Sequence, residues 1–233
     1  MITITALKWV PEFPRGQVRD YRARWILKEA GWDYRVWLLG GREDAAGFKA
    51  RHQPFGQVPV MQEDGRPTLF ETGAIVWSVA ERAGVLIPSD PAQRDLTHCW
   101  MIAALNSVEP FVMNIAEARY FIADAEAAKR REAEAMPMFE MRMGEVSDAL
   151  GERDWLVGDT FTVADLIMAG VLMIADRMDL LAKWPRLKAY VERASDRPAY
   201  RQAVAEQLAD FEGHGPEDMG WDPKDFEGAE VKR

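Results

Sequence analysis

The spacing between apolar side chains changes along the N-terminal part of the chain, from every second residue to helical spacing and back. Residues 2–6 alternate apolar and polar side chains, which predicts a β-strand. Residues 18–30 place apolar side chains at helical spacing, and Gly31 is a suitable C-terminal stop for that helix. Residues 32–38 are rich in aromatic and branched side chains, which predicts a second strand. A strand, a helix and a strand in this order form a βαβ unit, so we expect the two strands to be parallel.

The following stretch predicts a hairpin and a further helix. Residues 44–51 are weakly helical, whereas residues 60–62 and 68–70 flank an Asp-Gly pair, which is a hairpin signal. Residues 72–82 then return to helical spacing. The order β-α-β, a connection, and β-β-α matches a small thioredoxin-like α/β domain.

After residue 83 the pattern predicts helices alone. Residues 84–90 form a linker that ends in an Asp90 N-cap, with Pro91 at the first helical position. Helical spacing then covers residues 91–123, 125–150, 162–175, 185–194 and 198–211. In the two long stretches, Pro110 and Pro137 should kink or break the helix.

These patterns divide the chain into two domains, joined by the linker at 84–90, and a C-terminal tail. Residues 1–83 are the predicted thioredoxin-like domain, and residues 91–212 are the predicted all-α domain. Residues 213–233 are rich in Gly, Pro, Asp and Lys, so we expect a surface or mobile tail.

Composition narrows the class of protein. The apolar fraction of 48%, with nine Trp and ten Phe among 233 residues, is ample for packed cores and argues against disorder. The net charge of -9 disfavours nucleic acid and anionic membrane surfaces as partners. A single cysteine excludes an internal disulfide. With no signal-peptide pattern and no apolar run near the ~20 residues of a membrane span, we expect a soluble cytoplasmic protein.

One segment combines a bent strand edge with a helix start. Pro59 follows Val58 where a strand begins, and a proline there requires an edge, a bulge or a fixed, possibly cis, bend. The hairpin is followed by Glu71 and Thr72, an acid and a hydroxyl at a helix N-terminus. Such a terminus attracts negative charge. Together these features could hold a small peptide by its backbone and its carboxylate.

A second motif has a structural interpretation. Thr162 and Asp165 have the spacing of a reciprocal capping box, and Phe161 and Leu166 occupy the flanking apolar positions. We therefore expect Asp165 to be a folding cap and not a catalytic acid.

The combined pattern resembles the cytosolic, bacterial-type glutathione S-transferases. The likeness rests on the residues 57–59, the Asp-Gly hairpin, the run at 69–75 and the all-helical second half. The run from Asp154 to Leu166 is similar to the second strong motif of that family. The likeness covers nearly all of residues 1–212.

The resemblance implies a glutathione site in the first domain. Pro59 would be the family's cis-proline, and the backbone N–H and C=O of Val58 would pair with the cysteinyl part of glutathione. Glu71 and Thr72 would bind the γ-glutamyl end, and Gln57 would lie near the glycyl or γ-glutamyl part. The all-α domain would hold a small hydrophobic electrophile, and the protein would be a homodimer without a metal.

The sequence departs from the family in the loop after the first strand. Family members usually place Tyr, Ser or Cys there, facing the glutathione sulfur, whereas residues 9–20 contain none of these residues and no Thr. The tyrosine position falls on Phe13, which cannot donate a hydrogen bond. Tyr21 is the next hydroxyl, but its helical spacing favours a core position.

Another group must then favour the thiolate. Cations and helix N-termini lower a thiol pKa from about 8.5. Arg15 is the first candidate and Arg19 the second, together with the backbone amides around Gly16 and Gln17. The alternative is that both arginines are solvated or paired with neighbouring acids.

Other reactive residues are less informative. Cys99 lies in an apolar helical run, so we expect a buried and inert thiol. The absence of a Cys-x-x-Cys pair excludes a dithiol mechanism, and the three histidines have no metal-ligand spacing.

The resemblance leaves three functions open. The first is a glutathione transferase in which the glutathione thiolate attacks an apolar electrophile. The second is a binding or regulatory protein of the same fold with little activity. The third is a glutathione-dependent reductase, lyase or dehalogenase on that scaffold.

Overall fold

The computed structural model describes residues 1–41, 47–49 and 52–222. The chain forms two compact units, of which the first comprises Met1–Ala83 and the described part of Pro198–Arg233. The second comprises Gly84–Arg197. Most of the helix predicted at 44–51 lies outside the described residues. The predicted boundaries at 84–90 and 212 stay predictions, although the structure groups the last helix with the first unit.

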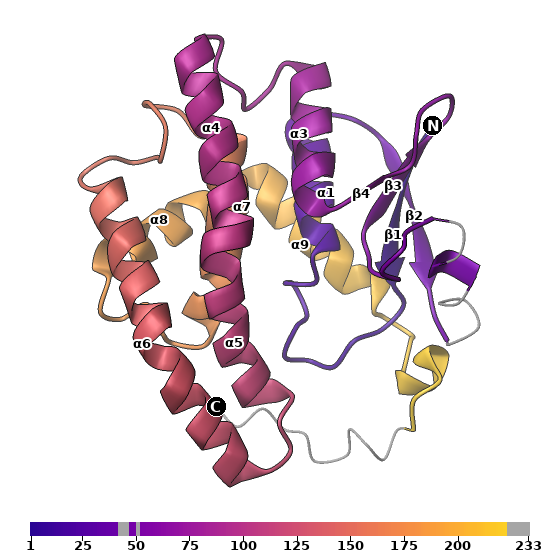
Figure 1. The fold of residues 1–233 in the computed structure, drawn as a ribbon. Helices are drawn as coiled ribbons and strands as arrows, with labels where there is room; N and C mark the ends of the chain where they lie inside the picture. Colours follow the sequence, from indigo (N-terminus) through magenta and orange to yellow (C-terminus); the bar gives the residue numbers. More distant parts are fainter. Residues whose placement is uncertain (42–46, 50–51, 223–233) are drawn as a thin grey trace. The chain divides into compact units, whose positions relative to one another are not determined.

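The first unit contains a four-stranded mixed sheet (Figure 1). Its strands are β1 (Ile2–Leu7), β2 (Tyr34–Leu39), β3 (Val60–Glu63) and β4 (Leu69–Phe70), in the order β2-β1-β3-β4. The pairing of β1 with β2 is parallel, whereas β3 is antiparallel to both β1 and β4. The predicted βαβ unit and hairpin are therefore confirmed.

Among the described residues, three longer helices belong to the same unit as this sheet. Helix α1 (Asp20–Glu29) contacts β1, α3 (Thr72–Ala83) and α9 (Pro198–Asp210). The rings of Trp25 and Tyr21 meet Tyr200 of α9 edge-on, with centroids 4.9 and 6.1 Å away. These contacts on several sides explain why α1 is buried continuously from its first residue through Leu27.

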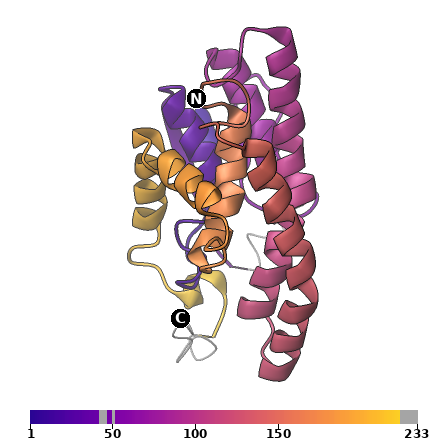
Figure 2. The ribbon, with the colours of Figure 1, turned by 90° about the vertical axis from the view of Figure 1, so that its left-hand side faces the viewer.

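The second unit is all-helical in its described elements. These are α4 (Pro91–Ala103), a π-helical stretch (Ala104–Val108), α5 (Glu109–Tyr120), α6 (Ala125–Leu150), α7 (Val163–Arg177) and α8 (Pro185–Ser195). Helix α7 is buried over most of its length because it contacts α4, α5 and α8. Figure 2 shows α6 running beside α5, in agreement with their contacts. The predicted class, a thioredoxin-like α/β part and an all-helical part, is confirmed.

The two prolines in long helical stretches behave differently. Pro110 lies in the first turn of α5, directly after the π-helical stretch, where the backbone hydrogen bonds depart from the α-helical pattern. Pro137 lies inside α6, which continues through it, so α6 is not broken there and the alternative, a kink, stays a prediction. Proline removes one helical hydrogen bond. The buried side chains of Ala135, Phe139 and Met143 pack α6 on both sides of that position.

The helical stretch Pro91–Tyr120 is long and apolar enough to cross a membrane by length and composition alone. Its segments contact α6 and α7, and 39% of its most apolar window is buried. The absence of a membrane segment therefore stays a prediction.

The capping box at the start of α7 is confirmed. The Asp165 carboxylate accepts from the backbone N–H and the hydroxyl of Thr162, both at 2.9 Å. It also accepts from the Leu156 N–H at 2.8 Å and from the Tyr190 hydroxyl at 3.0 Å. One buried carboxylate thus joins the preceding loop, α7 and α8.

Candidate functional site

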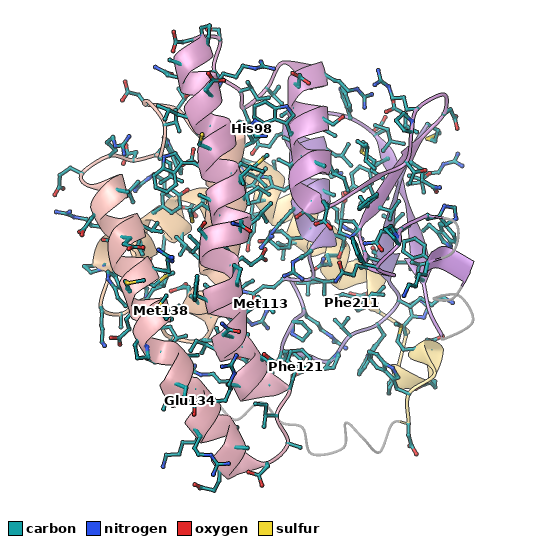
Figure 3. The ribbon with its side chains drawn as sticks, viewed as in Figure 1. His98, Met113, Phe121, Glu134, Met138 and Phe211 are labelled. Carbon is teal, nitrogen blue, oxygen red and sulfur yellow. The ribbon has the colours of Figure 1, made fainter. Side chains whose placement is uncertain are left out.

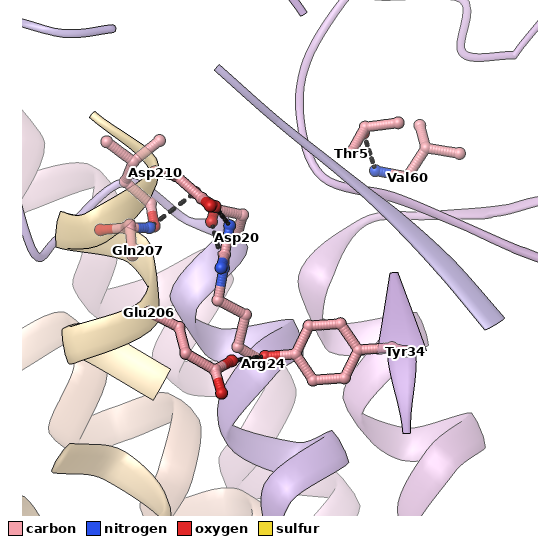
Figure 4. Close-up of polar contacts among 9 residues, drawn as sticks. Thr5, Asp20, Arg24, Tyr34, Val60, Glu206, Gln207 and Asp210 are labelled. Carbon is pink, nitrogen blue, oxygen red and sulfur yellow. Dashed lines mark hydrogen bonds and ion pairs between the residues drawn. The ribbon is translucent and has the colours of Figure 1, made fainter. Parts of the chain in front are cut away.

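The sheet register brings three separate segments to one end of the first unit. Ile4 pairs with Met61 across β1 and β3, and Val60 pairs with Phe70 across β3 and β4. The Val60 N–H also donates to the Thr5 hydroxyl at 2.8 Å (Figure 4). Because these pairings are antiparallel, the chain that leaves β1 and β4 lies at the end where β3 begins.

The bend before β3 leaves a backbone edge open. The peptide bond between Val58 and Pro59 is cis. The Val58 side chain packs against the cluster of Leu39, Phe48 and Val60. Among residues 1–41, 47–49 and 52–222, no group hydrogen-bonds to the backbone N–H or C=O of Val58. An extended peptide could therefore pair with both groups.

A buried glutamine shapes the loop before this edge. Gln53 is 3% exposed, and its side-chain oxygen accepts from the backbone N–H of Phe55 at 2.5 Å and of Gln57 at 3.1 Å. The Gln57 side chain is exposed. No role was predicted for Gln53, because a glutamine that folds back on its own loop leaves no periodic signal in the sequence.

The start of α3 holds an acid in an unusual backbone conformation. Glu71 has a φ of 67°, in the left-handed region, and its carbonyl accepts from the Ile75 N–H at 3.0 Å. Its side chain is exposed, and no described residue pairs with the carboxylate. Thr72 is buried as the first residue of α3. Such a conformation costs about 1–3 kcal/mol in a residue other than glycine and is concentrated at functional sites.

Together these groups suit a ligand with an α-amino carboxylate. The Glu71 carboxylate can hold an ammonium group, while the free N–H groups at the start of α3 attract a carboxylate. The open edge at Val58 can pair with the adjoining peptide backbone. The structure thus brings Val58, Pro59, Glu71 and Thr72 to one end of the sheet, and their roles in binding stay predictions.

The loop between β1 and α1 places the two candidate arginines differently. The Nε of Arg15 donates to the Val10 carbonyl at 3.1 Å. Its guanidinium carbon lies 5.9 Å from the centre of the Trp9 ring and 5.6 Å from that of Phe211, labelled in Figure 3. Arg19 is exposed at the residue before α1. Neither aromatic partner of Arg15 was predicted, because the contact with Phe211 spans most of the chain and the contact with Trp9 depends on how the loop folds.

Backbone amides of this loop are partly engaged in turns. The Gln17 N–H donates to the Pro14 carbonyl at 2.9 Å, whereas the Gly16 N–H has no partner in the described part of the chain. Gly16 has a φ of 78°, and an added Cβ would lie 3.4 Å from Val204. The side chain of Phe13 is half-buried. Of the two predicted amides, the one at Gly16 is thus the better placed to bind an anion.

A buried ionic network fixes the start of α1 (Figure 4). The Asp20 carboxylate accepts from Arg24 at 2.8 Å and from the Gln207 amide at 2.6 Å. Arg24 also pairs with Asp210 of α9. Burial raises the pKa of the Asp20 carboxyl, and the charge of Arg24 offsets only part of that effect. This network secures the residue that directly follows the loop.

The two other reactive side chains, Tyr21 and Cys99, differ in burial. Tyr21 is 1% exposed and lies in the core, as predicted. Cys99 is exposed, so its predicted burial is wrong. Helix α4 buries Thr97 and Met101, which leaves Cys99 on the opposite side.

Family models match most of the chain. The model described as "Glutathione S-transferase, N-terminal domain" matches residues 14–81, and that described as "Glutathione S-transferase, C-terminal domain" matches residues 108–198. The match boundaries agree with the thioredoxin-like and helical parts of the fold.

Individual proteins agree with this assignment. The chain is 29% identical to a glutathione S-transferase of Arabidopsis thaliana, over 78% of this chain and 77% of that one. It is 27% identical to a disulfide-bond oxidoreductase of Escherichia coli, over 79% of this chain and 90% of that one. A solved theta-class glutathione S-transferase from Xanthomonas axonopodis pv. citri, with glutathione bound, has a TM-score of 0.72 and 27% identity and covers 89% and 98% of the two chains.

Proposed function

The chain belongs to the glutathione S-transferase family, and from that premise we propose that it is a glutathione transferase acting on small apolar electrophiles. Two features at the same end of the sheet carry this proposal: the Val58 backbone and the Glu71 carboxylate, neither of which has a hydrogen-bond partner among the described residues. Glutathione is an extended peptide with an α-amino carboxylate at one end, so it matches both features.

Binding would place glutathione in a defined direction. Val58 would pair with the cysteinyl backbone, Glu71 and Thr72 would hold the γ-glutamyl end, and Gln57 would lie beside the peptide. The register supports this direction, because the chain that leaves β1 also lies at the end where β3 begins. The sulfur would then face the loop that contains Arg15 and Gly16.

The chemistry requires a thiolate at neutral pH. A free thiol has a pKa of about 8.5, and a nearby cation or helix N-terminus lowers that value. Arg15, the Gly16 amide and Arg19 are the candidates for this task. The thiolate would attack an electrophilic carbon and form a C–S bond, while the leaving group departs with its electron pair.

We also infer a cytoplasmic homodimer. The exposed face of α4 carries Leu96, Cys99 and Ile102 at helical spacing, with Leu96 53% and Ile102 49% exposed. Burial of this face in a second copy would remove apolar surface from water. Sedimentation of the purified protein tests this, because a monomer at all concentrations would contradict the dimer.

The proposed transferase is tested by titrating the ultraviolet thiolate absorbance of bound glutathione in the wild type and in Arg15→Ala. We expect a thiol pKa below the ordinary ~8.5 in the wild type, and a higher value in the variant. Failure to bind glutathione would refute the proposal. A thiol pKa that is equally low in Arg15→Ala and in the wild type would indicate that the Gly16 amide or Arg19 stabilises the thiolate.

A second function is favoured by one observation in the sequence. The loop 9–20 contains no Tyr, Ser, Thr or Cys, so the usual donor to the sulfur is absent. A binding or regulatory protein would bind glutathione without lowering its thiol pKa. A reductase is the other alternative, in line with the similar Escherichia coli oxidoreductase. Turnover of a disulfide substrate in preference to an electrophile would identify it.

A further inference from the structure

The segment after α9 returns to the loop between β1 and α1. Phe211 directly follows α9, and its N–H donates to the Leu208 carbonyl. The chain then forms a short 3-10 helix (Pro216–Met219) and reaches Trp221. The Trp221 ring meets the Trp9 ring edge-on, with centroids 5.9 Å apart. Residues 211–221, which we call the strap, therefore contact the same Trp9 side chain that lies beside Arg15.

Internal contacts give the strap a defined shape. The Asp218 carboxylate accepts from the Gly215 N–H at 3.0 Å and pairs with His214 at 3.2 Å. The Met219 side chain is buried, and the Trp221 N–H donates to the Pro216 carbonyl at 3.0 Å. The strap is thus a folded element with its own capping interactions.

The strap also approaches the sheet very closely. A Cβ atom built on Gly40, just after β2, would lie 2.5 Å from the carbonyl oxygen of Asp218. No side chain fits at that distance without movement of the backbone. Gly40 therefore allows the strap to dock beside the end of β1. At that end the N–H of Lys8, the residue after β1, donates to the Leu39 carbonyl of β2 at 2.9 Å.

The contacts around Arg15 form one cluster. Its guanidinium lies within 6 Å of the centres of two rings, Trp9 from the loop and Phe211 from the strap. That distance is within the range of cation–π attraction. The hydrogen bond from Nε to the Val10 carbonyl fixes a further point of the side chain. Two rings and one carbonyl thus restrict a side chain that is otherwise flexible.

We propose that the strap is a positioning element for catalysis, in which Phe211 holds the guanidinium of Arg15 toward the thiol of bound glutathione. This inference rests on the proposed function and adds that the C-terminal segment sets the reactivity of the sulfur. Phe211 and Trp221 are positioning residues, since they act through Arg15 and Trp9.

The test compares Phe211→Ala with Phe211→Tyr and with Phe121→Ala as a matched control. Phe121 is 65% exposed and belongs to the second unit, whereas the residues of the cluster belong to the first. We expect Phe211→Ala to raise the pKa of the bound glutathione thiol by about one unit, since a cation near the sulfur is no longer held in place. Turnover at neutral pH should fall by about tenfold and recover at alkaline pH, with the KM for glutathione unchanged. Phe211→Tyr and Phe121→Ala should resemble the wild type.

A second route displaces the strap without substituting any residue of the cluster. Gly40→Ala places a methyl group against the Asp218 carbonyl and should displace the strap, although Arg15 and Phe211 are intact. We expect the same rise in the thiol pKa. Arg15→Ala combined with Phe211→Ala should give no further rise beyond Arg15→Ala alone, because both act through one guanidinium.

The outcomes separate this inference from the proposed function. A wild-type thiol with an ordinary pKa would refute thiolate activation itself. A lowered wild-type value that is unchanged in both Phe211→Ala and Gly40→Ala would refute the positioning role alone. A loss of stability or a higher KM without a shift in the pH profile would show a purely structural strap and would also refute it.

Discussion

Two acids stand at helix starts in the two units, and their surroundings are opposite. Asp165 at the start of α7 is fully buried and accepts four hydrogen bonds. Glu71 before α3 is exposed, has no partner in the described residues and holds a left-handed backbone. A carboxylate that is saturated by its own chain stabilises the fold, whereas one kept unsatisfied at a conformational cost is available to a ligand.

Asp165→Ala should produce the largest effect. It leaves several buried donors without an acceptor, so we expect the free energy of unfolding to fall by about 3 kcal/mol. Glutathione affinity should change little at temperatures where the variant is folded. Urea unfolding measures the stability, and Asp159→Ala, at an exposed acid nearby, is the control. If Asp165→Ala were as stable as the wild type but lost its affinity for glutathione, Asp165 would be the ligand-binding acid and the comparison with Glu71 would be wrong.

Glu71→Ala combined with Thr72→Ala should have the opposite profile. Loss of the charged and hydroxyl partners should weaken glutathione binding by about 2 kcal/mol, or roughly thirtyfold. Stability should change far less than in Asp165→Ala. Calorimetric titration measures the affinity. Glu126→Ala is the matched control, since Glu126 is an exposed acid in the first turn of α6. Retained affinity would mean that the site lies elsewhere.

The pH dependence of stability should distinguish the buried acid. Burial raises the pKa of Asp165 above its ordinary value, although its hydrogen bonds lower it in part. The folded state therefore binds this proton more tightly, and its contribution is fully present below the ordinary pKa of the residue. The contribution is lost as pH rises through the raised pKa, at up to about 1.4 kcal/mol per pH unit. Asp165→Asn should lack that slope. Equal slopes in unfolding curves of the two proteins would contradict the raised pKa.

Glu71→Gly should separate backbone strain from binding. Glycine adopts the left-handed conformation freely, so the variant should gain about 1 kcal/mol of stability while losing affinity for glutathione. Glu71→Ala keeps the strained backbone and should lose affinity without that gain. A thermal unfolding series of the three proteins measures the difference. Equal stability of the glycine and alanine variants would show that position 71 stores no strain.

Local patterns in the sequence were sufficient for the order of elements and for the cap. The alternation at 2–6 and the spacing from Thr162 to Asp165 are short-range signals, and both correspond to the structure. The segments at Val58 and Glu71 were also recognisable, because a proline at a strand start and an acid at a helix start have local causes. Which groups are left unpartnered there is a property of the folded chain.

Long-range packing set the limits of prediction. Helix α4 carries apolar residues on more than one side, so periodicity could not decide that Met101 is buried and Ile102 exposed. The aromatic neighbours of Arg15 are Trp9 and Phe211, which lie too far apart in the sequence to be recognised as one cluster. The continuity of α6 through Pro137 likewise depends on packing around it.

The exposure of Cys99 has a practical consequence. Since the chain has no other cysteine, a maleimide dye or a spin label would attach at a single known point on α4 without any prior mutagenesis. The rate at which Cys99 reacts would then report on association, because the proposed dimer buries this thiol whereas a monomer leaves it exposed. The same thiol would allow the protein to be immobilised in one orientation on a sensor surface.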